Sequence, residues 1–236
     1  MRILTIQDCA IETFGLYERY LTTHGHEVLV VHAYKDHTLP PLETVDAILV
    51  GGTPISVRDV ESHSFLKAEY DYLRRAVDAD VPCLGICFGG QILARVLGAE
   101  VRRCAQMEIG VYEARLTSEG RDDPLLAGFP ERFPVFQWHG DTFDVPRDAR
   151  LLVEGEVCRN QMFRLGNVVG VQFHLEVAAD EVASWADEYS AELELVNKTK
   201  SQVLAECTEH QAGLEQLGAR FLDNFVAIAA RRRVSG

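Results

Sequence analysis

Cys87 stands in a pattern that suits a nucleophile. It is the centre of Gly85-Ile86-Cys87-Phe88-Gly89, between an apolar run and a stretch with helical periodicity. A G-x-nucleophile-x-G pattern is typical of a sharp strand-to-helix turn that lifts the middle side chain clear of a sheet. The start of a helix also stabilises a thiolate, which is the reactive form of cysteine. The same five residues are equally consistent with glycines that permit tight packing around an unreactive cysteine.

A cysteine nucleophile needs a base, and the base needs a group that orients it. Among the eight histidines, His174 follows the apolar run 168–173 and precedes Glu176 by two positions. Side chains at i and i+2 of an extended chain project to the same side, so these two can lie next to each other. In a parallel sheet this strand end is also the edge where the Cys87 turn emerges. His139, within the segment 137–141, is the rival candidate for the base.

Alternating apolar runs and helical patterns have to position these residues. Strands that are apolar throughout and separated by helices indicate a parallel sheet covered on both faces. The fold class is therefore α/β, with an open, mostly parallel sheet flanked by helices. The pattern predicts strands at 2–6, 27–31, 46–50 and 81–86, and helices at 12–23, 63–77 and 90–97.

Between positions 101 and 173 the pattern changes to shorter strands, some of them antiparallel. The sequence Gly166-Asn167 suits a tight hairpin, and from residue 180 onward the periodicity is helical. We expect two C-terminal helices with a break near 197–201 or at Gly213. Residues 1–236 are interpreted as a single domain, in which about 180–236 form a helical C-terminal segment. The expected strands are 109–116, 133–138, 151–154, 161–165 and 168–173.

Composition and charge exclude several classes of protein. No apolar run approaches the roughly 20 residues that a membrane span needs. The formal net charge of −13 opposes phosphate backbones, so nucleic-acid binding is not expected. Polar Gln7 and Asp8 come too early for a signal peptide, which favours a cytoplasmic location. The six cysteines contain no C-x-x-C pair, so neither a disulfide framework nor a metal site is predicted, and no cofactor is expected.

Three segments together resemble the class I glutamine amidotransferases. Residues 85–91 (GICFGGQ) look like the nucleophile signature of that family, and residues 170–176 (GVQFHLE) look like its His-x-Glu signature. Gly51-Gly52-Thr53-Pro54 is similar to its glycine-rich oxyanion loop, and all three segments occur in the family's order. The resemblance implies the flavodoxin-like α/β fold of these enzymes.

The resemblance also implies a role for each matching residue. Cys87 would attack the side-chain amide of glutamine, which forms a γ-glutamyl thioester and releases ammonia. His174 would take and return the proton, and Glu176 would hold the imidazole. The backbone N–H groups of Gly52 and Phe88 would bind the oxyanion.

Substrate contacts are implied for a second group of residues. The segment 138–141 is similar to the Ser-His-Gly-Asp segment of the guanosine monophosphate synthetase glutaminase, and Glu108 is a candidate acceptor for the α-amino group. An exposed carboxylate at the start of a strand is the alternative for Glu108. The chain has Leu175 where the family most often has proline, and Thr53 intervenes in Gly-Gly-Pro, which leaves the second oxyanion donor open. The residues expected to bind substrate are Gln91, Glu108, Trp138, His139 and Gly140.

Three functions are consistent with this set of residues. The favoured one is a glutaminase that hydrolyses glutamine and delivers ammonia to a separate synthetase. The second is a stand-alone hydrolase of γ-glutamyl peptides or amines, because the same thioester chemistry serves any γ-amide. The third is a non-enzymatic binding module of the same fold, which the complete set Cys87, His174 and Glu176 disfavours.

Overall fold

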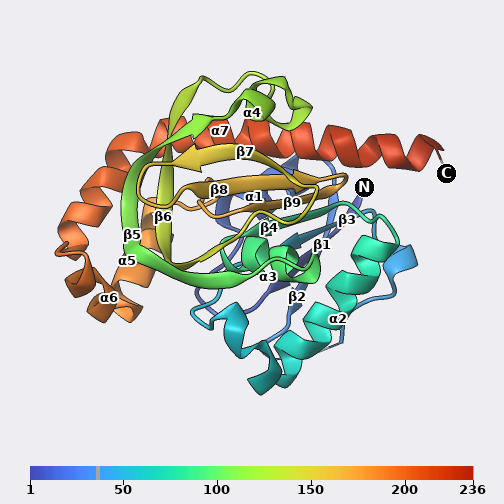
Figure 1. Cartoon of the computed structure of the whole chain (residues 1–236), viewed down its shortest axis with the longest axis horizontal. Helices are drawn as coiled ribbons and strands as arrows, with labels where there is room; N and C mark the ends of the chain where they lie inside the picture. The colour runs from blue at the N-terminus through green and yellow to red at the C-terminus, as the bar shows by residue number, and fades with distance from the viewer. Residues whose placement is uncertain (36–37, 236) are drawn as a thin grey trace.

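The computed structural model describes residues 1–35 and 38–235. All nine strands within these residues form one sheet (Figure 1). Seven α-helices and three short 3₁₀ helices lie within these described residues. The strands are β1 (Arg2–Gln7), β2 (Glu27–His32), β3 (Ala47–Val50), β4 (Cys83–Ile86), β5 (Val101–Leu116), β6 (Arg132–Phe143), β7 (Arg150–Gly155), β8 (Asn160–Leu165) and β9 (Val168–Val171). The helices are α1 (Gly15–Thr23), α2 (Ser64–Asp78), α3 (Phe88–Val96), α4 (Ser118–Asp122), α5 (Ala179–Glu188), α6 (Ser190–Leu195), α7 (Lys200–Ser235), η1 (Leu42–Thr44), η2 (Val57–Ser62) and η3 (Pro124–Leu126).

The strands follow the order β2-β1-β3-β4-β9-β8-β7-β5-β6. The pairs from β2 to β9 are parallel, and the pairs from β9 to β6 are antiparallel. The α/β fold class is confirmed, and so is the hairpin between β8 and β9, in which Leu165 pairs with Val168. Because β4 and β9 are parallel neighbours, their carboxyl ends meet at one edge of the sheet.

The parallel strands are buried on both faces. In β3, Ala47 and Leu49 belong to one hydrophobic cluster, whereas Ile48 and Val50 belong to the other. This alternation follows from the two-residue period of a strand and explains why these strands are apolar throughout. Helices α1, α5 and α7 contribute to the first cluster, and α2 and α3 contribute to the second.

The antiparallel half of the sheet curls back toward the parallel half. Phe136 of β6 exchanges two backbone hydrogen bonds with His174, at 2.8 and 3.2 Å, although β6 and β9 are not neighbours in the strand order. A shift in the pairing of β5 with β6 between Arg103 and Glu108 marks a bulge, which bends a strand. The curl brings β6 to the edge of the sheet at which β4 and β9 end.

Several boundaries differ from the predicted ones. The first helix begins at Gly15 rather than at residue 12, since the φ of +41° at Gly15 lies outside the helical range and prevents the helix from starting earlier. The C-terminal region has three helices rather than two. It breaks at Tyr189 and again near Asn197, which has a φ of +52°, whereas Gly213 lies inside α7. No helix in the described part of the chain combines the length and apolar character that crossing a membrane requires.

Candidate active site

Cys87 occupies the predicted turn between β4 and α3. Its φ of +54° and ψ of −109° are unusual for a residue other than glycine and indicate local backbone strain. A Cβ on Gly85 would lie 2.1 Å from the carbonyl oxygen of Gly89, and a Cβ on Gly89 would lie 2.2 Å from that of Val50. Close approach of the backbone therefore requires both glycines, as a tight strand-to-helix turn demands.

His174 and Glu176 lie just beyond the carboxyl end of β9, and both are buried. Nδ1–H of His174 donates to Oε1 of Glu176 at 2.5 Å, and the other carboxylate oxygen accepts from the N–H of Leu175 at 3.0 Å. The ring of Trp185 packs edge-on against the imidazole, with 5.0 Å between the centroids. These contacts fix the orientation of the ring. Among the described residues, Nε2 of His174 has no hydrogen-bond partner, so it is free to exchange a proton.

The electrostatic surroundings of His174 favour its charged form. Burial of the ring lowers its pKa, but the carboxylate of Glu176 and the thiol of Cys87 act in the opposite direction and outweigh burial. The net result is a pKa of His174 well above its ordinary value. An imidazolium next to a cysteine stabilises the thiolate, which is the nucleophilic form.

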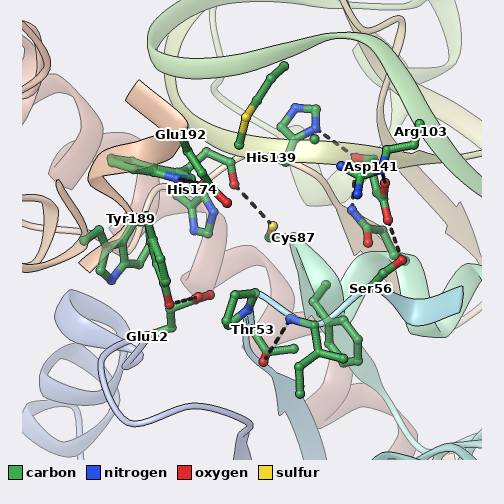
Figure 2. Close-up of a pocket in the computed structure, with 18 of the residues that line it drawn as sticks. Glu12, Thr53, Ser56, Cys87, Arg103, His139, Asp141, His174, Tyr189 and Glu192 are labelled. Carbon is green, nitrogen blue, oxygen red and sulfur yellow. Dashed lines mark hydrogen bonds and ion pairs between the residues drawn. The ribbon is translucent and has the colours of Figure 1, made fainter. Parts of the chain in front are cut away.

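The sulfur of Cys87 faces a pocket enclosed by both halves of the sheet and the C-terminal helices (Figure 2). Figure 2 shows Cys87 at the centre, with His174 on one side and His139 and Asp141 on another. The pocket, including the solvent-filled space at its mouth, has a volume of about 790 Å³. Its lining comprises Glu12, Thr53, Pro54, Ile55, Ser56, Cys87, Phe88, Gln91, Arg103, Met107, Trp138, His139, Gly140, Asp141, His174, Trp185, Tyr189, Glu192 and Leu195.

Two glutamines connect the nucleophile to the pocket wall. Nε2 of Gln172 lies 3.7 Å from Sγ of Cys87, and the side-chain oxygen of Gln172 accepts from Nε2 of Gln91 at 3.2 Å. Gln91 also donates to the backbone oxygen of Asp141 at 3.1 Å. Gln91 therefore lines the pocket near Cys87, and Gln172 is a further residue beside the sulfur that sequence reasoning did not single out. Its signal was available, because it lies two residues before His174 and shares its side of the extended chain.

His139 lies in the pocket wall, but its ring is differently connected from that of His174. Nε2 of His139 lies 3.0 Å from Oε2 of Glu108, and Nδ1 lies 2.9 Å from the backbone oxygen of Asp141. Both ring nitrogens of His139 thus have acceptors, whereas Nε2 of His174 has none in the part of the chain that the structure describes, and this difference favours His174 as the base. Glu108 is buried rather than exposed, and it also accepts from Nε2 of Gln161 at 3.1 Å. It lies behind His139 and is not among the described residues that line the pocket.

Of the two expected oxyanion donors, Phe88 lines the pocket, whereas Gly52 directly precedes the lining residue Thr53. Phe88 is the first residue of α3, so its N–H is one of those that a helix leaves without an intrahelical acceptor. Gly52 is buried in the loop after β3. Trp138 and Gly140 both line the pocket, and Nε1–H of Trp138 donates to Oε2 of Glu192 at 2.7 Å.

One wall of the pocket was not predicted from the sequence. This acidic wall consists of Glu12, Tyr189 and Glu192. Glu12 lies in the loop after β1, and its Oε1 accepts from the hydroxyl of Tyr189 at 2.8 Å. Burial raises the pKa of Glu12 to about 7, although the Tyr189 hydrogen bond opposes the shift. The available signal for Glu12 was its place after a parallel strand, where sites of α/β proteins lie. Tyr189 lies at the break between α5 and α6, and Glu192 lies in α6; only the tertiary structure places them at the pocket.

Known proteins resemble this chain both in sequence and in structure. The family model of glutamine amidotransferase class-I matches residues 5–184, which include the Cys87 turn and the His174–Glu176 pair. The chain belongs to the class I glutamine amidotransferases. A crystal structure of a glutamine amidotransferase from Thermotoga maritima superposes with a TM-score of 0.89 at 34% identity, covering 96% of this chain and 98% of that one.

Curated relatives include members with and without a stated reaction. The glutamine amidotransferase-like protein YfeJ of Salmonella typhimurium is 32% identical over 187 residues, which cover 77% of this amidotransferase and 78% of YfeJ. One subunit of the glutamine-hydrolysing GMP synthase of Sulfurisphaera tokodaii is 34% identical over 178 residues, covering 73% of this chain and 90% of that subunit. Family membership therefore supports glutamine amidotransferase activity in general terms.

Proposed function

We propose that this amidotransferase hydrolyses the side-chain amide of glutamine through a γ-glutamyl thioester on Cys87. The observation that carries the proposal is the geometry of buried His174, whose Nε2 has no hydrogen-bond partner among the described residues and whose Nδ1 is held by Glu176 beside the strained Cys87 turn. A nucleophile, a base and an orienting carboxylate form the arrangement that covalent acyl transfer requires.

In the proposed reaction the thiolate of Cys87 attacks the amide carbon, and the C=O electron pair moves to oxygen. Backbone N–H groups of Phe88 and Gly52 stabilise this oxyanion. As the tetrahedral species collapses, His174 gives its proton to the departing nitrogen and ammonia leaves. Water then attacks the thioester while His174 takes a proton from it, and glutamate departs as the thiolate reforms. Gln172 and Gln91 hold the region around the sulfur in place.

The end of the substrate that carries the α-amino and α-carboxylate groups is proposed to contact Trp138, His139 and Gly140, since these residues line the pocket across from His174. Glu108 is proposed to position His139 from behind through their 3.0 Å contact. Arg103 and Arg58 lie 3.5 Å from Asp141, whose other carboxylate oxygen accepts from Ser56 at 2.6 Å. These contacts tie the loop after β3 to β6 across the pocket mouth.

A second substrate class is suggested by the shape of the pocket. Tyr189 at the α5–α6 break and Glu192 and Leu195 of α6 form part of the wall, so the pocket extends past the triad to these helices. A γ-glutamyl peptide or amine would place its leaving group there. Glutamine is nevertheless preferred, because curated relatives include the glutamine-hydrolysing GMP synthase subunits. A separate ammonia-accepting synthetase is the partner that this proposal implies.

The test is glutamate release from glutamine and from a panel of γ-glutamyl peptides and amines. We expect wild-type protein and Cys207→Ser, which changes a thiol outside the pocket, to release glutamate equally, and Cys87→Ala to show none. Mass spectrometry after rapid acid quenching should detect the γ-glutamyl adduct on Cys87. Equal background rates for wild type and Cys87→Ala on every substrate would refute the proposal, and turnover of peptides but not glutamine would select the second substrate class.

A further inference from the structure

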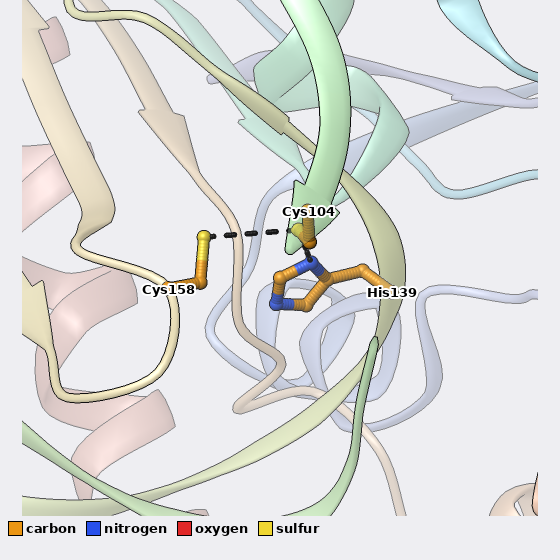
Figure 3. A group of neighbouring side chains, drawn as sticks. All are labelled: Cys104, His139 and Cys158. Atoms are coloured by element: carbon orange, nitrogen blue, oxygen red, sulfur yellow. Dashed lines mark hydrogen bonds between the residues drawn. The ribbon is translucent and has the colours of Figure 1, made fainter. Parts of the chain in front are cut away.

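Three potential metal ligands converge behind the wall of the pocket (Figure 3). Sγ of Cys104 lies 3.9 Å from Sγ of Cys158 and 3.5 Å from Nδ1 of His139. All three ligand atoms lie within 4.8 Å of one another. His139 and Cys158 are buried, and Cys104 is half-buried. Figure 3 shows the sulfur of Cys104 between that of Cys158 and the ring of His139, which come from separate segments of the chain.

We propose that Cys104, Cys158 and His139 bind a divalent cation of the zinc type. In a tetrahedral site with Zn–S of about 2.3 Å and Zn–N of about 2.0–2.1 Å, neighbouring sulfurs are about 3.8 Å apart and sulfur and nitrogen about 3.5 Å apart. The two distances from Cys104 agree with these values. Two thiolates and an imidazole also form a ligand set that selects zinc over calcium or magnesium.

The second ring nitrogen of His139 has the partner that a metal-bound histidine needs. Nε2 lies 3.0 Å from the buried carboxylate of Glu108, which Gln161 also holds. A carboxylate that accepts from one ring nitrogen leaves the other free to coordinate and raises its basicity. Nδ1 now lies 2.9 Å from the backbone oxygen of Asp141, and coordination would replace that contact. The hydroxyl of Thr142, 3.1 Å from Sγ of Cys158, or a water completes four ligands.

The charge balance of the site is also favourable. Binding releases one proton from each thiol, and the two thiolates neutralise the doubly charged ion. The carboxylates of Glu108 and Asp141 nearby, in a chain of net charge −13, add attraction for a cation. No electron transfer is involved, so the site needs no oxidant or reductant.

The fold explains why the sequence did not predict this site. Cys104 lies in the bulge of β5, His139 lies in β6, and Cys158 lies in the turn between β7 and β8. These segments are far apart in the sequence, and no C-x-x-C pair marks them. A bound ion would fasten the three segments together and hold His139 in the pocket wall. The site shares His139 with the proposed substrate pocket, but ion binding does not require the proposed reaction, because Cys87, His174 and Glu176 are not ligands.

The experiment is metal analysis of the full chain, purified with a phosphine reductant and without chelator. We expect about one zinc ion per chain by elemental mass spectrometry. After removal of the metal, titration with Co²⁺ should produce thiolate-to-cobalt charge-transfer absorption. Cys104→Ser and Cys158→Ser should each lose this absorption and the zinc, whereas Cys207→Ser, also a buried thiol, should retain both. The conservative variant Glu108→Gln should bind zinc roughly 10- to 100-fold more weakly.

Wild-type protein that takes up neither zinc nor cobalt would overturn the proposal. So would cobalt binding whose charge-transfer absorption persists in both Cys104→Ser and Cys158→Ser. A Cys104–Cys158 disulfide in the reductant-treated protein, seen as a loss of two hydrogens in the intact mass, would also overturn it. The Cys87→Ala variant distinguishes zinc binding from catalysis, because it should bind zinc normally even though it should be inactive. If serine variants do not fold, Glu108→Gln and wild type still decide the outcome by their zinc affinities.

Discussion

Gly52 and Glu12 are in such close contact that a Cβ on Gly52 would lie 2.1 Å from Oε2 of Glu12. The Glu12 side chain is not free to move aside, because it is buried and its other oxygen accepts from Tyr189 at 2.8 Å. The loop after β1 and the loop after β3 are thus fitted to each other without room for a methyl group. This contact fixes the backbone that is proposed to supply an oxyanion donor.

Gly52→Ala should therefore displace the oxyanion loop. We expect kcat for glutamine hydrolysis to fall by about 10²–10³, the usual effect of losing one oxyanion donor. The matched measurement is the same substitution in a Glu12→Ala background, where the colliding carboxylate is absent. The decrease caused by Gly52→Ala should be smaller there, since residues in contact couple energetically. Equal decreases in both backgrounds would show that the Gly52–Glu12 contact does not position the loop.

Glu176→Gln should impair catalysis, although the glutamine side chain has nearly the same size and shape as that of glutamate and fills the same space beside His174. The amide can still contact Nδ1, but the negative charge that raises the pKa of His174 is lost. We expect kcat/KM to fall by roughly 10²–10⁴ and the pKa of the His174 ring, followed by NMR titration, to decrease. Glu188→Gln, an exposed position on α5, is the control and should leave both quantities unchanged. An unaltered His174 pKa in Glu176→Gln would contradict the assigned role of the carboxylate.

Gly89→Ala should destabilise the protein, because its Cβ would meet the carbonyl oxygen of Val50 at 2.2 Å. The expected loss in the free energy of unfolding, measured in urea, is about 1–3 kcal/mol. Gly213→Ala is the comparison, since Gly213 lies inside α7 and a Cβ there would meet no atom of the described residues within 4 Å. That substitution should stabilise the protein by about 0.5–1 kcal/mol through better helix propensity. A Gly89→Ala protein as stable as wild type would argue against the close approach of α3 to β3.

Asp8 and Glu69 should make stability depend on pH. Burial raises the pKa of Asp8, and the neighbouring charge of Glu69 raises it further; burial also raises the pKa of Glu69 to about 7. Because these folded-state values exceed the unfolded ones of roughly 4, the pair favours folding most below pH 4. That contribution is lost as pH rises toward 7 and above.

Glu69→Gln removes one of these titrating groups. We expect the Tm of Glu69→Gln minus the Tm of wild type to be more positive at pH 8 than at pH 5. Asp78→Asn, an exposed substitution on the same helix α2, should show a Tm difference from wild type that is the same at both pH values. A Glu69→Gln difference that does not change between pH 5 and pH 8 would mean that Glu69 titrates normally in the folded protein.

The parallel strands of the core were predictable because the apolar character of their residues directly reflects burial on both faces of the sheet. Ala47 to Val50 are all apolar since both faces of β3 are covered, and the hairpin at Gly166 has its expected turn residues. The His174–Glu176 contact was predictable for a similar reason, because it depends on neighbours in the sequence and on one strand direction. Local patterns of this kind need no knowledge of distant packing.

The acidic wall and the limits of the long strands depend on distant packing instead. Arg102 and Arg103 are exposed and polar, so the first part of β5 carried no apolar signal even though it pairs with β6. Glu12 was assigned to a helix by its periodicity, but its contact with Tyr189 joins residues 177 positions apart. Such contacts follow from the curl of the sheet and from the C-terminal helices, which no local pattern reveals.

Helix α7 has a consequence for how the chain folds as it is synthesised. Its residues Leu214, Phe221 and Phe225 belong to the same hydrophobic cluster as Ile3 and Phe14. That face of the sheet cannot be closed until α7 has left the ribosome, after every strand has emerged. The opposite face draws on α2 and α3 and none of its buried members comes from α7 within the described residues, so it can pack earlier. We expect a nascent chain with one covered face and one exposed apolar face, which is the state in which a chaperone would bind it.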